Sequence, residues 1–88
     1  GDVDAGRIDA LATLTDGTWW VVDWKSTLPD TAAASYELHG EQLGRYAHVA
    51  GSSGAPQVVV TLSAIDDPSR DYTWRVGPDG TAEPASRP

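Results

Sequence analysis

Residues 19–26 read Trp-Trp-Val-Val-Asp-Trp-Lys-Ser, an apolar and β-prone run that ends in an acid and a base two positions apart. Because side chains alternate between the two faces of a strand, Asp23 and Lys25 share a face with Trp19 and Val21. The two charged groups then stand roughly 6.6 Å apart along the strand. This strand is therefore expected to present a carboxylate and an amine together.

A second strand is predicted upstream, over residues 5–14, where apolar side chains recur at every second position from Ile8 to Leu14. Asp16-Gly17 is a turn signal between the two strands. The two strands should therefore form a β-hairpin, which brings Asp9 close to the end of the second strand.

Two hairpin registers are open. A two-residue loop puts Asp9 and Asp23 on opposite faces of the sheet. A three-residue loop with Gly17 in the left-handed conformation pairs Leu14 with Thr18, and the two acids then face each other with Cβ atoms about 4.5–5.5 Å apart. We predict the three-residue loop, because a slip of one residue would move the acid to the wrong face.

The remaining chain alternates helix and strand patterns. Residues 35–50 have helical periodicity, 57–64 form an apolar run typical of a strand covered on both faces, and 72–76 suit an edge strand. The order β-β-α-β-β predicts an α/β fold with a mixed sheet, in which the helix is a crossover connection. Residues 1–77 are expected to form the core, and residues 78–88 a disordered tail or linker.

Composition limits the class of protein. The 88 residues suit one small domain and include no cysteine, which excludes a disulfide framework or a thiolate zinc site. The lack of cysteine also fits a cytoplasmic location. No stretch is long enough to span a bilayer and no signal-peptide pattern is present, so we expect no membrane partner. The start without Met suggests a piece of a longer protein.

A net charge of −7 disfavours a free-standing nucleic-acid binder, which usually has a basic face. It is compatible with a catalytic module whose nucleic acid is delivered by an attached partner.

Five residues are candidates for chemistry. Asp9 and Asp23 would offer the hard oxygen ligands that magnesium or manganese prefers, and Lys25 could stabilise charge on a phosphate. Gln42 and Tyr46, four residues apart, share a helix face that can reach the second strand. The alternative is structural: a surface ion pair of Asp9 with Lys25, a core tyrosine and a solvated glutamine.

Four blocks occur in a set order: Gly-Arg-Ile-Asp at 6–9, Asp-Gly at 16–17, Val-Val-Asp-Trp-Lys-Ser at 21–26 and Gln-Leu-Gly-Arg-Tyr at 42–46. Together they resemble the RecB-type branch of the PD-(D/E)xK nuclease superfamily, in particular nuclease domains fused C-terminal to UvrD-type helicases. The resemblance implies a restriction-endonuclease-like fold, and the N-terminal helix of that fold, which carries a further acidic or His residue, is absent from this chain.

The same resemblance implies a function. It suggests a magnesium- or manganese-dependent deoxyribonuclease, exo- or endonucleolytic, that works with a helicase motor domain in the same chain or complex during DNA double-strand-break repair. Asp9, Asp23 and the Trp24 carbonyl would bind the metal, and Lys25 would be the catalytic lysine. Gln42 and Tyr46 would match the family's Gln-x-x-x-Tyr helix motif, which supports the site and the DNA backbone.

Two alternatives remain open. One is a catalytically inactive nuclease-like module with a structural or binding role in such a complex. The other is an acidic, Trp-rich module that binds sugars or protein, which would need a row of exposed Trp rings. We favour packing of Trp19, Trp20 and Trp24 under helices. His39 and His48 receive little weight, because nine residues separate them and they do not share a helix face; of the two, His39 near the helix start is the better candidate.

Overall fold

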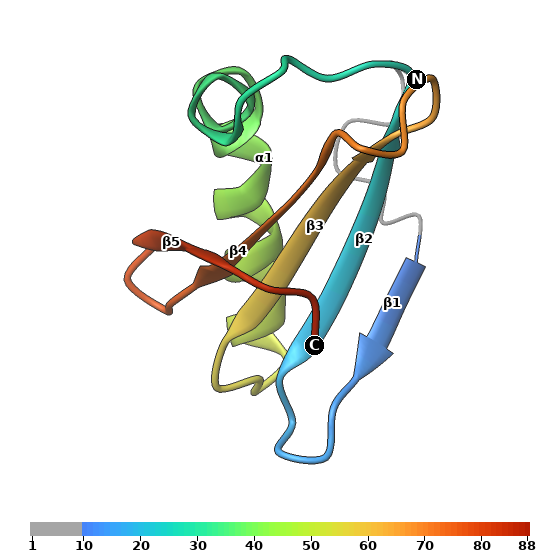
Figure 1. Cartoon of the computed structure of the whole chain (residues 1–88). Coiled ribbons are helices and arrows are strands. Elements are labelled where there is room, and N and C mark those ends of the chain that lie inside the picture. Colours follow the sequence, from blue (N-terminus) through green and yellow to red (C-terminus); the bar gives the residue numbers. More distant parts are fainter. Residues whose placement is uncertain (1–9) are drawn as a thin grey trace.

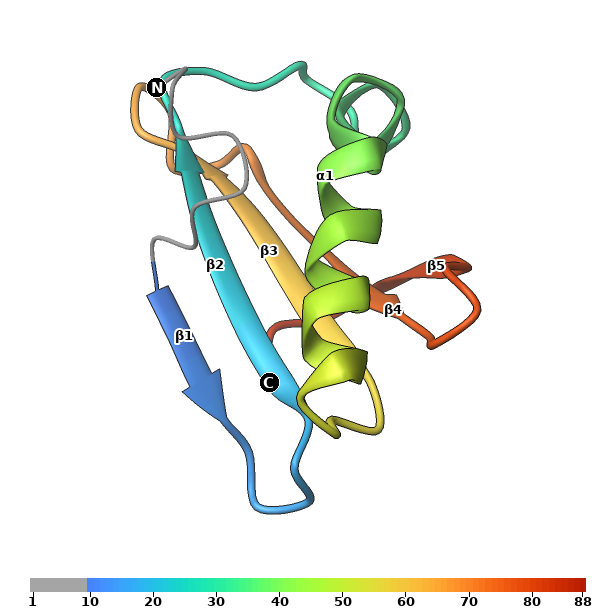
Figure 2. The same cartoon turned by 180° about the vertical axis from the view of Figure 1, so that it is seen from behind.

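The described part of the chain forms a mixed sheet with one helix on one face (Figures 1 and 2). The computed structural model describes residues 10–88. The five strands lie in chain order across the sheet, which confirms the predicted α/β, restriction-endonuclease-like class. The elements are β1 (Ala10–Thr13), β2 (Trp19–Lys25), α1 (Ala32–Ser52), β3 (Val58–Ala64), β4 (Asp71–Val76) and β5 (Ala82–Ala85).

The hairpin between β1 and β2 has the predicted three-residue loop. The backbone N–H of Leu14 donates to the Thr18 carbonyl at 2.8 Å, and the Gly17 N–H donates to the Leu14 carbonyl at 2.9 Å. Gly17 has a φ of 92°, a left-handed conformation that a side chain would disfavour. The ladder continues to Ala10 opposite Val22, so the predicted register is confirmed. Asp9 lies outside the described residues.

The helix connects two parallel strands, as predicted. β2 pairs in parallel with β3, from Trp19 beside Val58 to Lys25 beside Ala64. α1 is longer than the predicted 35–50 because Thr31 caps it, its side-chain oxygen accepting the Ala34 N–H at 3.1 Å. Within residues 10–88, no helix combines the length and apolarity needed to cross a membrane.

The core lies between α1 and the central strands. All seven residues of β3 are buried, which confirms the prediction of a strand covered on both faces. Leu43, Tyr46 and Ala50 of α1 pack onto Val21 of β2 and the apolar side chains of β3. This packing fixes the distance of the helix from β2, which positions the polar groups between them.

The C-terminus departs from the predictions. Residues 82–85 form β5 instead of a disordered tail, and they pair with β4, which is therefore not an edge strand. The composition of this segment suggests disorder, but an edge strand needs only backbone pairing on one side. Pro84, which has no N–H to donate, is tolerated there because β5 is the edge.

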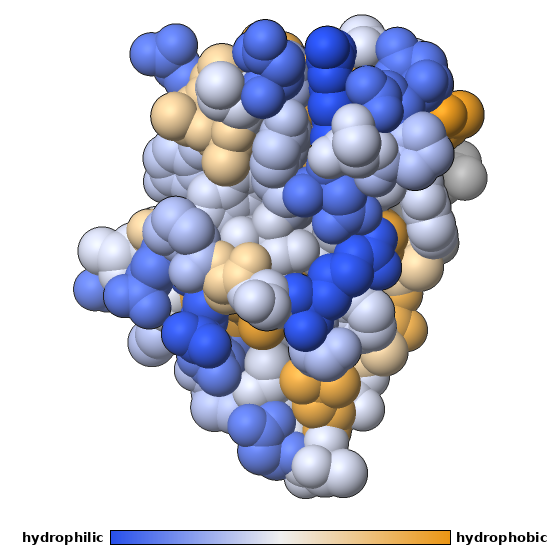
Figure 3. Space-filling view, viewed as in Figure 1, coloured by the Kyte–Doolittle hydropathy of each residue, from blue (hydrophilic) through white to orange (hydrophobic). Residues whose placement is uncertain are grey.

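The last residues cross the sheet on the face opposite to α1 (Figures 1 and 2). Arg87 donates two hydrogen bonds to the Asp71 carboxylate, one of 3.2 Å from Nε, and its guanidinium lies 5.7 Å from the ring centroid of Trp20. Figure 3 shows this face as largely hydrophilic, with apolar colour in small separate areas. The C-terminal segment therefore covers part of a sheet face that α1 leaves open.

We expect Arg87→Ala to lower the free energy of unfolding by about 1 kcal/mol. The variant loses one exposed ion pair and one cation–π contact, each of which contributes about 0.5–1 kcal/mol. Arg45→Ala is the matched control, because Arg45 pairs only with Glu41 on the exposed side of α1. Urea denaturation measures both variants, and equal losses would contradict the role of Arg87.

The difference between wild type and Arg87→Ala should become smaller in acid, where only the cation–π contact with Trp20 still contributes. The Arg87 hydrogen bonds lower the pKa of Asp71 below its ordinary value of 3.8. A lowered aspartate pKa contributes stability above the unfolded-state value, and this contribution is lost as the pH falls through the folded-state value. Denaturation above pH 4 and in stronger acid therefore separates the ion pair from the cation–π contact.

Candidate active site

β2 directs its two charged side chains toward α1. Asp23 and Lys25 follow Val21 on the face that packs against the helix, as strand alternation requires. Asp23 is only 4% exposed, whereas the Lys25 side chain is 22% exposed and reaches solvent. A buried carboxylate therefore lies behind a partly accessible amine.

Two side chains of α1 hold this pair. The Tyr46 hydroxyl donates a hydrogen bond of 2.7 Å to Oδ2 of Asp23. The Lys25 ammonium donates to Oε1 of Gln42 at 2.7 Å and lies 3.4 Å from the same Oδ2 atom. The structure thus brings together four of the five predicted site residues.

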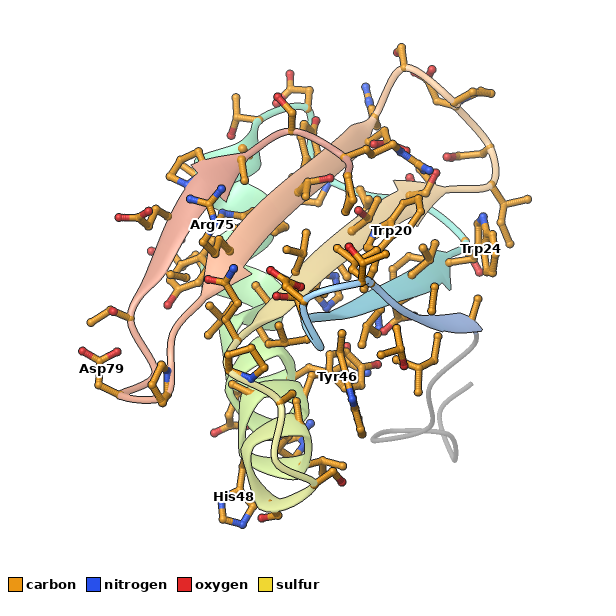
Figure 4. All side chains as sticks on the ribbon, turned by 90° about the horizontal axis from the view of Figure 1, so that it is seen from below. Trp20, Trp24, Tyr46, His48, Arg75 and Asp79 are labelled. Carbon is orange, nitrogen blue, oxygen red and sulfur yellow. The ribbon has the colours of Figure 1, made fainter. Side chains whose placement is uncertain are left out.

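The spacing of the four residues follows from the geometry of strand and helix. Two residues of β2 cover about 6.6 Å, and four residues of α1 cover about 6 Å. Because the two elements run in opposite directions, Asp23 meets Tyr46 and Lys25 meets Gln42. In Figure 4 the Tyr46 side chain lies between α1 and β2, whereas Trp20 and Trp24 lie on the other side of β2.

These contacts compensate for the burial of Asp23. A carboxylate removed from water is strongly destabilising unless it is paired and hydrogen-bonded. Tyr46 and Lys25 supply a hydroxyl and a positive charge, and within residues 10–88 no buried side-chain nitrogen or oxygen lacks a hydrogen-bond partner. These partners therefore satisfy the buried carboxylate within an apolar layer.

The donors available to a cation are oxygen atoms. The backbone hydrogen-bonding groups of successive residues in β2 point to alternate sides of the strand. The Thr18 carbonyl bonds on the β1 side, whereas the Trp19 N–H and the Lys25 carbonyl bond on the β3 side. The Trp24 carbonyl therefore points to the β1 side, beside Asp23. A carboxylate and a carbonyl fit magnesium or manganese chemistry, although residues 10–88 hold no group of three His, Cys, Asp or Glu side chains suited to a metal ion.

His39 is the residue of this site to which sequence reasoning gave too little weight. It is half-buried on α1, and its imidazole is affected by both charges of the site. Burial lowers the pKa of His39 below 6.5, the Lys25 charge lowers it further, and Asp23 acts in the opposite direction. The available signal was its spacing, three residues before Gln42 and seven before Tyr46 on one helix face.

The tryptophans do not form an exposed row. Trp19 packs against the core, and the Trp20 indole N–H donates to Thr61 Oγ1 at 3.0 Å. Trp24 is 47% exposed, so the prediction that all three pack under helices is wrong for Trp24, and Trp20 lies on the face without a helix. The row of rings that a sugar-binding surface requires is therefore not formed.

We expect Tyr46→Phe to lower the free energy of unfolding by about 2 kcal/mol with the fold retained. The variant removes a buried hydrogen bond to a charged group, a bond of about 1.5–3 kcal/mol. Tyr36→Phe makes the same chemical change at a ring of the same helix that is 39% exposed, compared with 1% for Tyr46. Chemical denaturation of both variants is the measurement, and an equal effect of the two would count against the Asp23–Tyr46 contact.

Comparison with known proteins identifies a family to which the sequence is similar. A family model described as the PD-(D/E)XK nuclease superfamily matches residues 5–86, nearly the whole chain. No curated protein and no solved structure gives a significant match. Membership of this superfamily suggests nuclease activity and a DNA substrate. The chain belongs to the PD-(D/E)XK nuclease superfamily.

Proposed function

We propose that this domain is a metal-dependent deoxyribonuclease that hydrolyses phosphodiester bonds with a metal-activated water. The observation that supports this most directly is the convergence of Asp23 and Lys25 on one face of β2, each held by a side chain of α1. The ion pair of a buried acid with a partly exposed amine contributes little to stability, because the cost of removing the charges from water offsets much of the attraction between them. In a nuclease family the same arrangement has a chemical use.

The proposed ligands of a magnesium or manganese ion are Asp23, the Trp24 carbonyl and Asp9. If the β1–β2 ladder, which pairs Ala10 with Val22, extends by one position, Asp9 falls opposite Asp23. In such an extension the position would be a non-hydrogen-bonded pair, the type in which side chains lie closest, with Cα atoms about 4.5 Å apart. When bound, the ion would polarise a phosphate and acidify a water.

Lys25 would act on the substrate itself. Its ammonium has three N–H donors. One donates to Gln42, and with Asp23 alongside, donors are left for a phosphoryl oxygen or the attacking water. Its positive charge would stabilise the negative charge that develops on the phosphoryl oxygens. Gln42 and Tyr46 would be positioning residues, because each fixes one charged group through a short hydrogen bond.

The charge distribution supports delivery of the DNA by a partner. Each arginine in residues 10–88 lies within 4.0 Å of a carboxylate, and Lys25 does too. Binding of DNA by phosphate neutralisation needs cations that are available to the phosphates. We therefore propose that a helicase motor domain, in the same chain or complex, presents the DNA during double-strand-break repair in the cytoplasm.

Asp23→Asn and Lys25→Gln should each reduce magnesium-dependent cleavage of linear DNA at least 100-fold, because losing one charge-stabilising group in a site of this kind costs about that factor. Asp66→Asn, at an exposed loop acid, should cleave like the wild type. Cleavage is followed on gels, with circular dichroism to verify the fold.

Wild-type rates in both site variants would overturn the proposal. A wild-type protein that cleaves no DNA with magnesium or manganese would favour the alternative, a catalytically inactive nuclease-like module with a structural or binding role.

A further inference from the structure

We propose that His39 is a substrate-binding residue of this site. It donates a hydrogen bond to a DNA phosphate that neighbours, along the same strand, the phosphate contacted by Lys25. The inference rests on the proposed function, since it assumes that a DNA strand passes over the exposed side of Lys25. It adds a third residue of α1 to the site, beyond Gln42 and Tyr46.

The placement of His39 follows from the pairing of α1 with β2. Tyr46 contacts Asp23, and Gln42, one helical turn earlier, contacts Lys25. His39 is three residues earlier still, about 4.5 Å along the helix axis, on the same side. It therefore lies just past Lys25, where the strand ends and the site opens to solvent.

The accessibility of these helix residues increases in the same direction. Tyr46 and Gln42 are buried, while His39 is half-buried. The polar groups of the two buried residues hydrogen-bond to Asp23 and Lys25 within the domain. The third is accessible to a molecule that arrives from solvent at the open end.

Among the residues that the structure describes, His39 has no hydrogen-bond partner for its ring. Neither ring nitrogen hydrogen-bonds to a residue between positions 10 and 88, whereas Gln42 and Tyr46 both do. A neutral imidazole carries one N–H donor and one acceptor. Burial and the Lys25 charge favour the neutral form, which can still donate to a phosphate oxygen. A core histidine would normally satisfy these atoms inside the protein.

The test uses short oligothymidylate as the probe, without a divalent metal, and follows the histidine ring signals by NMR. His48 is the internal control, since it is exposed and points away from the sheet at the far end of α1 (Figure 4). We expect the His39 ring signals to shift on titration while those of His48 stay in place.

Variants test the same contact quantitatively. His39→Ala should weaken binding of the oligonucleotide about tenfold, the effect of one lost hydrogen bond to a charged group, whereas His48→Ala should bind like the wild type. His39→Gln, which keeps an N–H donor, should recover most of the loss. In cleavage assays His39→Ala should raise KM more than it lowers kcat.

Three results would overturn the inference: equal affinities of His39→Ala and His48→Ala, a His39 signal that stays still while Lys25 signals shift, or no response of His39 at millimolar probe. Failure of the proposed function is a separate result. It would appear as a wild-type protein that shows the His39 shift but cleaves no DNA with magnesium or manganese.

Discussion

The hydrogen bond from Tyr46 to Asp23 joins the two parts of this small domain. It connects the only helix in residues 10–88 to the strand that carries the charged pair, and it does so inside the apolar layer between them. Because Asp23 is buried, its negative charge requires this donor and the Lys25 ammonium nearby. Apolar packing sets the position of α1, and these polar contacts tie the geometry of the candidate site to that position.

The candidate site thus lies on one face of the sheet, and the ion pair of the C-terminal segment lies on the other. On the helix face, Asp23 and Lys25 are paired with each other and with α1. On the opposite face, Arg87 links the C-terminal segment to Asp71 and Trp20. A variant on the second face should therefore affect stability without touching the site.

Sequence reasoning succeeded where local geometry leaves few options. Asp16-Gly17 allowed two registers, and the requirement that both acids share a face selected the one observed, with Leu14 opposite Thr18. It failed where the outcome depends on what covers a surface. Alternation assigns Trp24 to a face but does not reveal that this face has no helix, and the composition of residues 82–85 hides a strand held by backbone pairing. His39 received little weight because it was compared with His48 instead of with Gln42.

The most direct test of the site is a titration with manganese, whose unpaired electrons broaden NMR signals of nearby nuclei. The backbone signals of Asp23 and Trp24 should broaden first, at ion concentrations that leave the turn around Asp79 unchanged. Broadening confined to exposed acids such as Asp66 and Asp67, with β2 unaffected, would show that the buried carboxylate does not bind the ion and would contradict this account of the site.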